Sequence, residues 1–176
     1  MTRRIGLYSG TFDPIHKGHV AFAQMAQKEC FLDMIVFLPE TDPRGKKNVT
    51  DIAKRAQHIQ QKIEHLPSLA VSILSSTQFN SRTTLPELRQ LFPSADFTLL
   101  LGSDVVQTMP YRWDDLEMLL PEVSFAVGMR VDDTAETVTT VFDHLKEKYA
   151  TDITYSLIST DHSHLASSQI RNRAAS

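Results

Sequence analysis

The chain has 176 residues, of which 41% are hydrophobic and 22% are charged, and its net charge is -3. This length supports one domain, residues 1–176, with a core that needs no disulfide or metal, and the composition excludes disordered and fibrous proteins. The single cysteine, Cys30, makes no internal disulfide, and no run approaches the roughly 18 apolar residues of a membrane span. We therefore expect a cytoplasmic protein.

Positive charge is concentrated in the first third of the chain. Residues 1–55 carry nine Lys or Arg against six Asp or Glu, whereas residues 56–176 carry nine against fifteen. A local basic region on an acidic protein suits a small polyanion such as a nucleotide better than a nucleic acid polymer, which needs a broad basic face. The expected partners are therefore small molecules, with no nucleic acid polymer and no membrane.

Apolar runs of strand length alternate with helical patterns along the chain. In chain order, strands are expected at residues 4–9, 33–39, 69–74, 96–102, 123–129 and 153–158. Helices are expected at residues 18–30, 50–65, 84–92, 103–120 in two pieces broken at Pro110, 134–149, and near 166–174. Strands that are apolar almost throughout are covered on both faces, so the pattern predicts an α/β fold with a doubly wound, mostly parallel sheet. Ligands of such sheets bind at the carboxyl ends of the strands.

The stretch "SGTFDPIHKGH", residues 9–19, joins the first expected strand to the first expected helix. It delivers His16 and His19 to the first helical turn, where free N–H groups and the helix dipole stabilise an anion. We therefore expect both imidazoles to donate to phosphate. A zinc site is disfavoured because the chain has no His-Glu-x-x-His pattern and no nearby cysteine pair. For either histidine alone, a surface or capping role is the alternative.

These residues resemble the signature of the His-x-Gly-His nucleotidyltransferase superfamily, and most closely that of the nicotinate mononucleotide adenylyltransferases. Further segments follow in the order that the family shows: "LGSDVV" at 101–106, Trp113, "FAVGMR" at 125–130 and "SSQIR" at 167–171. The resemblance covers nearly the whole chain and implies a Rossmann-like nucleotidyltransferase architecture. It also implies that the AMP moiety of ATP, which carries Mg²⁺, is transferred to nicotinate mononucleotide, giving deamido-NAD and pyrophosphate in NAD biosynthesis.

The resemblance assigns roles by position. The catalytic residues that it implies are His16, His19 and Arg171. The ATP-binding residues that it implies are Gly10, Thr11, Phe12, Lys46, Gly102, Asp104, Ser167, Ser168 and Ile170. The residues implied to bind the second substrate are Arg82, Thr83, Thr84, Trp113 and Arg130, and no residue is expected to bind a metal.

Each role has a structural alternative. The basic loop 39–49, which we expect to be a mobile flap, offers Lys46 or Lys47 to phosphate, or neither. Asp104 either binds a ribose or stabilises the start of a helix, and Trp113 either stacks on the pyridine or packs in the core. Ser167 and Ser168, with Arg171 on the same helix face, form either a phosphate clamp or an ordinary capped helix.

Two segments depart from the family pattern. "NSRTTLPEL" at 80–88 has Arg82 where the family has an aromatic residue, so Arg82 either pairs with a carboxylate and favours nicotinate or points to solvent. Ala166 replaces a hydroxyl residue, while Ser168 keeps a hydroxyl at the threonine position of the family. His162 and His164, just upstream, are read as exposed loop histidines in preference to metal ligands.

Two other functions compete with this interpretation. One keeps the chemistry and changes the acceptor to nicotinamide mononucleotide, phosphopantetheine or another phosphate, with CTP as a possible donor. The other is a nucleotide-binding module without catalysis. A homo-oligomer is compatible with the sequence, which does not specify the oligomeric state.

Overall fold

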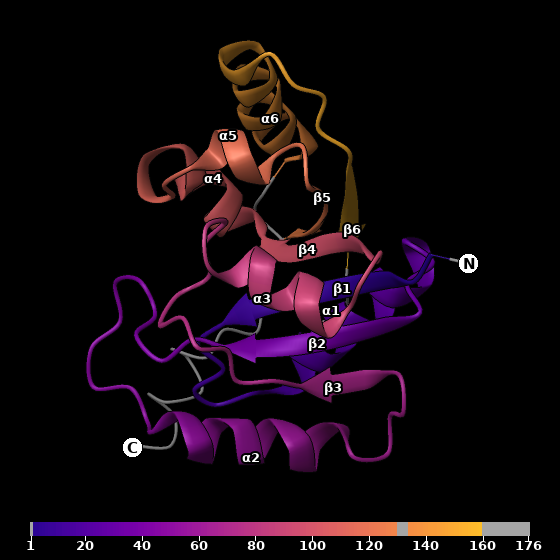
Figure 1. The fold of residues 1–176 in the computed structure, drawn as a ribbon, viewed down its shortest axis with the longest axis vertical. Coiled ribbons are helices and arrows are strands. Elements are labelled where there is room, and N and C mark those ends of the chain that lie inside the picture. Colours follow the sequence, from indigo (N-terminus) through magenta and orange to yellow (C-terminus); the bar gives the residue numbers. More distant parts are fainter. Residues whose placement is uncertain (1, 130–133, 160–176) are drawn as a thin grey trace.

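The computed structural model describes residues 2–129 and 134–159, which form one sheet with helices on both faces (Figure 1). The strands are β1 (Arg4–Gly10), β2 (Met34–Pro39), β3 (Leu69–Val71), β4 (Asp96–Gly102), β5 (Val123–Met129) and β6 (Tyr155–Ser159). The helices are α1 (Lys17–Glu29), α2 (Ile52–Ile63), α3 (Thr84–Leu91), α4 (Ser103–Arg112), α5 (Leu116–Leu119) and α6 (Ala135–Tyr149). All pairings among the described strands are parallel, so the predicted doubly wound α/β class is confirmed.

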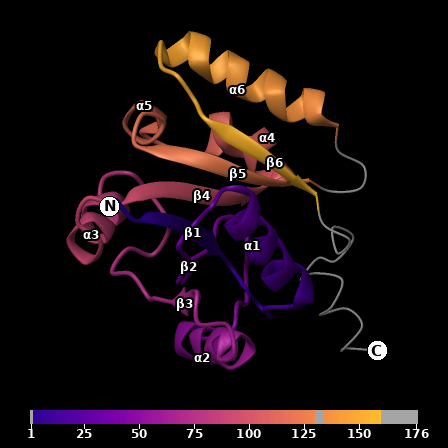
Figure 2. The ribbon, with the colours of Figure 1, turned by 90° about the vertical axis from the view of Figure 1, so that its right-hand side faces the viewer.

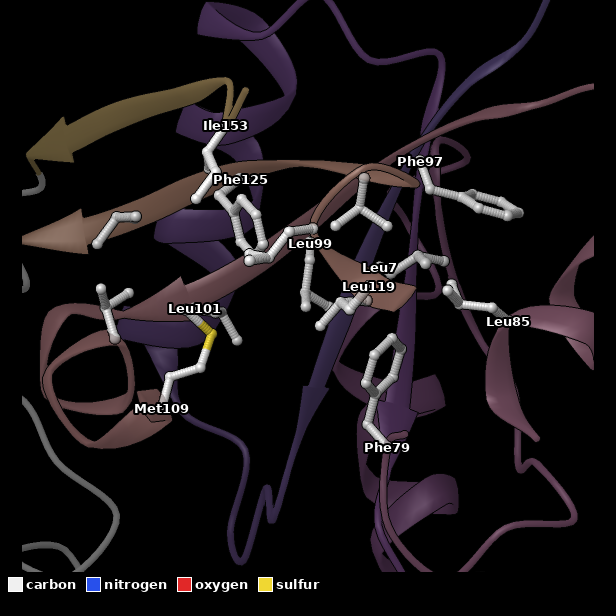
Figure 3. Close-up of a cluster of buried hydrophobic side chains, with 14 of the residues drawn as sticks. Leu7, Phe79, Leu85, Phe97, Leu99, Leu101, Met109, Leu119, Phe125 and Ile153 are labelled. Carbon is white, nitrogen blue, oxygen red and sulfur yellow. The ribbon is translucent and has the colours of Figure 1, made fainter. Parts of the chain in front are cut away.

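Two apolar clusters cover the two faces of the sheet because neighbouring strand residues point to opposite sides. On β2, Ile35 and Phe37 join the cluster that contains α1 and α2, whereas Val36 and Leu38 join the cluster that contains α3 to α6. Figure 3 shows part of the second cluster, with Leu99 of the central strand β4 among its members. Strands covered in this way must be apolar on both sides, which explains the continuous hydrophobic runs.

The strand order is β3-β2-β1-β4-β5-β6, so the chain builds outward from β1 to β3 and then returns to place β4 on the other side of β1. Figure 2 shows the strands fanned between α2 at one edge and α6 at the other. At the point where the order reverses, β1 leads to α1 on one face of the sheet and β4 leads to α4 on the other face. Ligands of doubly wound sheets bind in the crevice at such a point. The segment after Gly10 and the segment after Gly102 are therefore brought together at this edge.

Two expected boundaries differ most from the structure. The helix at 103–120 does not break at Pro110, which lies inside α4; the break falls after Arg112, where Trp113 is extended with φ -109° and ψ 127°. Asp115, with a left-handed backbone of φ 56°, then precedes α5. One missing N–H is tolerated near the end of a helix, whereas an extended residue ends the helical path. The third strand is shorter than expected, because it is an edge strand that pairs only with three residues of β2.

The helix expected at 50–65 is α2, which begins at Ile52, two residues later than expected. Asp51 caps this helix and accepts hydrogen bonds from the backbone N–H groups of Ala53 and Lys54. The helix expected near 166–174 lies outside the described residues. Among the residues that are described, no helix is long and apolar enough to cross a membrane.

Candidate active site

The loop after β1 places the first candidate residues at the crevice. Phe12 has a left-handed backbone, φ 46°, which is costly for a residue with a side chain and needs support from packing. Its ring is 2% exposed and lies edge-on to Tyr8, with centroids 5.0 Å apart, and 5.3 Å from Phe37. Phe12, expected to bind ATP, is therefore packed in the apolar cluster that contains α1 and α2.

The two histidines of the motif form a stacked pair at the start of α1. Their ring centroids are 3.7 Å apart, with an angle of 27° between the planes. The backbone N–H of His16 donates to Nδ1 of His19 at 3.2 Å. Because a neutral imidazole has one donor and one acceptor nitrogen, this bond assigns the ring proton of His19 to Nε2. The Nε2–H of His19 is thus a donor on the side of the ring away from the backbone of His16.

His16 is buried, with 8% of its surface exposed, yet within the described part of the chain neither of its ring nitrogens has a hydrogen-bond partner. Leaving buried polar atoms unpaired is unfavourable, so such atoms at a helix start point to a ligand that the structure does not contain. The first backbone N–H groups of a helix also need partners from outside the helix. An anion would satisfy both requirements.

Burial keeps this pair uncharged near neutral pH. Burial lowers the pKa of His19 to about 3, and the neighbouring His16 contributes to the same shift. Burial also lowers the pKa of His16. Two imidazolium rings at stacking distance would repel each other, so the neutral state fits the geometry. The pair therefore acts through N–H donors and through the helix dipole, without full charges of its own.

The end of β4 lies against the same aromatic group. The ring centroid of Tyr8, on β1, lies 6.1 Å from that of His19. Burial raises the pKa of Tyr8, and the charge of Asp104 adds to this effect. A Cβ atom on Gly102 would come within 2.5 Å of Oδ1 of Asp104, so glycine leaves the room in which this carboxylate folds back over the strand end. Asp104 is exposed, whereas Ser103 is fully buried. The structure thus brings His16, His19 and Asp104 to one edge, as the sequence predicts.

Trp113, at the end of α4, is partly buried beside two residues that the sequence analysis missed. The ring of Phe79 lies 5.9 Å away, and the guanidinium of Arg44 lies 5.4 Å from the centre of the indole. Arg44 also donates to the carbonyl of Phe79 and lies 3.9 Å from a carboxylate oxygen of Glu40. Neither residue has a sequence signal, because both lie in loops whose path only the fold defines.

Arg82 is exposed, with 64% of its side chain accessible to solvent, and is also paired within the protein. Its guanidinium makes two hydrogen bonds of 2.6 Å to the carboxylate of Asp115, the left-handed residue between α4 and α5. This contact raises the pKa of Arg82 and lowers the pKa of Asp115. The two guanidinium nitrogens that would bind a substrate carboxylate are thus bonded to Asp115.

The two threonines that follow support the start of α3. The hydroxyl of Thr84, fully buried, accepts the backbone N–H of Asn80 and lies 3.0 Å from the hydroxyl of Ser76. Thr83 donates through both its backbone N–H and its hydroxyl to the side-chain oxygen of Asn80. These contacts account for both hydroxyls as parts of the local turn.

Of the remaining candidates, Gly10 and Thr11 are partly buried at the end of β1, and the others are exposed or outside the described residues. Lys46 and Lys47 are exposed in the loop that follows β2. The residues outside are Arg130, His162, His164, Ser167, Ser168, Ile170 and Arg171. In the described ranges, no group of three or more His, Cys, Asp or Glu residues could hold a metal ion.

The sequence analysis also missed Arg55, a buried residue of α2 with 1% exposure. A signal was present, because Arg55 stands on the same helical face as Ile59 and Ile63, four and eight residues further on. A charged residue on an apolar helix face is unusual, because a buried charge needs partners.

Comparison with known proteins agrees with this geometry. Residues 7–173 match the model of the cytidylyltransferase-like family. The chain is 32% identical to the "Probable nicotinate-nucleotide adenylyltransferase" of Neisseria meningitidis serogroup C, over 99% of this chain and 88% of the relative. A structure of Plasmodium falciparum nicotinic acid mononucleotide adenylyltransferase complexed with APC superposes with a TM-score of 0.75 at 20% identity, covering 97% of this chain and 83% of the other. The same enzyme complexed with NaAD also gives 0.75, at 22% identity and the same coverage.

The fold and the site define a nucleotidyltransferase of the cytidylyltransferase-like family, and this chain belongs to that family. Within it, the chain belongs to the nicotinate-nucleotide adenylyltransferases, which are enzymes of NAD biosynthesis. The resemblance stated from the motifs is thereby confirmed for the family. The roles of individual residues stay predictions.

Proposed function

We propose that this protein transfers the AMP moiety of ATP to nicotinate mononucleotide and releases pyrophosphate. The observation that carries the proposal is the neutral, stacked pair of His16 and His19 at the start of α1, where β1 and β4 diverge. The unpartnered ring nitrogens of His16 fit a bound anion. The relatives named above supply the identity of the acceptor.

In the proposed reaction, a phosphate oxygen of the mononucleotide attacks the α-phosphorus of ATP. A new P–O bond forms, the bond between the α-phosphorus and the bridging oxygen breaks, and pyrophosphate leaves with that electron pair. Negative charge spreads over the phosphoryl oxygens in the transition state, so the protein contributes mainly by positioning and by electrostatic stabilisation. The N–H groups of His16, His19 and the first turn of α1 would serve as these donors.

Other groups at the edge would orient the substrates. We propose that Asp104 accepts hydrogen bonds from a ribose and that Trp113 stacks on the pyridine ring. The donors at the start of α1 are N–H groups, which bind phosphate oxygens and not cations, so this site fits Mg²⁺ that is held by the triphosphate. Such a cation would neutralise part of the phosphate charge. With ATP as a substrate and one unpaired cysteine, we propose a cytoplasmic location.

The test is pyrophosphate release from ATP with Mg²⁺, with nicotinate mononucleotide, nicotinamide mononucleotide and phosphopantetheine compared as acceptors. We expect a strong preference for nicotinate mononucleotide. Turnover with another acceptor alone would keep the chemistry and contradict the proposed substrate. Tight ATP binding without pyrophosphate release for any acceptor would instead favour a non-catalytic nucleotide-binding module.

A further inference from the structure

Arg55, on α2, connects three separate segments of the chain through backbone carbonyls. Its Nε donates to the carbonyl of Thr50 at 2.6 Å, its Nη1 to that of Thr11 at 2.6 Å, and its Nη2 to that of Glu40 at 2.8 Å. Thr11 belongs to the motif loop after β1, Glu40 follows β2, and Thr50 precedes α2. All three guanidinium nitrogens of one side chain are thus used to hold loops in place.

A second contact joins two of the same segments. The side chain of Asp13, in the motif loop, accepts the backbone N–H of Thr50 at 3.0 Å. The charge of Asp13 also acts on Arg55: burial lowers the pKa of the guanidinium, and the carboxylates of Asp13, Asp51 and Glu40 oppose this effect. Arginine stays protonated in proteins, so a compensated buried cation lies beneath the motif loop.

This contact is close in the chain to the candidate phosphate donors. The Thr11 carbonyl that Arg55 holds precedes Phe12, the residue with the left-handed backbone. The ring of Phe12 in turn lies 5.1 Å from that of His19. A displacement of the Thr11 carbonyl would therefore change the position of the loop that leads into the histidine pair.

We propose that Arg55 is a positioning residue for nucleotidyl transfer: by fixing the Thr11 carbonyl against α2, it sets where His16 and His19 present their N–H groups. The inference rests on the proposed function. Lysine cannot replace it fully, because a single ammonium group cannot reach carbonyls of three segments as the planar guanidinium does. Arg55 touches no reacting atom and acts through the loop.

Arg89, on α3, provides a matched control near the amino ends of the strands. It also donates to a backbone carbonyl, that of Ala95, pairs with Glu122 at 3.1 Å, and lies over the ring of Phe97 at 4.5 Å. Ala95 precedes the amino end of β4, far along the strand from the crevice. Arg89 therefore shares the structural role of a loop-binding arginine without access to the motif loop.

The experiment compares Arg55→Met, Arg55→Lys and Arg89→Met by kcat, by KM for each substrate and by melting temperature, with kcat taken per folded molecule. We expect Arg55→Met to lower kcat by about 100-fold, as for a small misplacement of catalytic groups, with the KM for the mononucleotide unchanged. Arg55→Lys should recover part of this loss. Arg89→Met should lower the melting temperature and leave kcat unchanged.

A folded Arg55→Met protein with the kcat of Arg89→Met would overturn the inference. If the methionine variant does not fold, the lysine variant decides, and a wild-type kcat in folded Arg55→Lys would overturn it. If the wild-type protein releases no pyrophosphate with any acceptor, the proposed function fails separately. In that case the test of Arg55 is the rise in melting temperature that ATP causes. Arg55→Met should abolish this rise, and Arg89→Met should keep it. A rise that persists in Arg55→Met would overturn the inference.

Discussion

The backbone N–H of His16 donates to Nδ1 of His19 at 3.2 Å while the two rings stack 3.7 Å apart. One residue thus fixes the tautomer of the other, since the bonded Nδ1 of His19 leaves the proton on Nε2. A neutral donor with a defined direction suits a phosphate oxygen whose charge grows in the transition state.

Replacing His19 with alanine should lower kcat by a factor on the order of 10² to 10³, because it removes a positioned donor to the phosphoryl oxygens. The measurement is steady-state pyrophosphate release, with circular dichroism to show that the variant is folded. His58→Ala is the control, since His58 is an exposed histidine of α2. Turnover close to that of the control would contradict the assigned role.

The free energy of unfolding should rise with pH between about 3 and 6.5 and then level off. The pKa of His19 is about 3 in the folded protein and near its ordinary value in the unfolded chain, so the unfolded state binds more protons over this range. Protonation therefore favours unfolding as the pH falls below about 6.5. One such group contributes a slope of at most about 1.4 kcal/mol per pH unit.

Urea titrations at several pH values would measure this slope in the wild type and in His19→Gln. The glutamine variant should have a smaller slope, because one of the two neutral buried imidazoles is gone. Equal slopes in both proteins would show that His19 has an ordinary pKa.

Asp104→Asn should raise the KM for the substrate whose ribose it binds by roughly tenfold, as expected for loss of a hydrogen bond to a charged group. Asp96→Asn is a matched control, because Asp96 is an exposed aspartate at the opposite end of β4. Unchanged KM values for both substrates would assign Asp104 to the helix start alone.

Trp113 is the single tryptophan of the chain, so its fluorescence reports one site. Adding nicotinate mononucleotide should change this fluorescence if the pyridine stacks near the indole, and Trp113→Ala should raise the KM for the mononucleotide roughly tenfold. Phosphopantetheine serves as a ligand without an aromatic ring. An emission spectrum that stays the same at saturating mononucleotide would argue for a packing role beside Phe79.

Arg82→Gln should leave the preference for nicotinate over nicotinamide mononucleotide unchanged, because the guanidinium is engaged by Asp115. The measurement is the ratio of kcat/KM for the two acceptors. Asp115→Asn removes the same ion pair from the other side and separates loss of the pair from loss of the arginine. A collapse of the ratio in Arg82→Gln alone would mean that Arg82 exchanges Asp115 for the substrate carboxylate.

The sequence by itself determined the parallel α/β sheet, because strands buried on both faces must be apolar throughout. It also determined the pairing of His16 and His19 at a helix start, because their spacing and the preceding turn residues are local features. The positions of Pro110 and Asp115 show the limit of such reasoning. Proline is the stronger local signal, yet α4 continues past it to Arg112. The extended Trp113 and the left-handed Asp115, which is paired with Arg82, then separate α4 from α5.

Only the tertiary structure decided which distant residues meet. Glu40 accepts the hydroxyl of Ser9 and the backbone N–H of Phe79, and Arg55 reaches across 44 positions to Thr11. Such contacts depend on strand order, which places β2 beside β1 and sets the paths of the loops that follow these strands. Local propensity does not encode a contact between segments so far apart, because its free energy is gained only when the whole sheet has formed.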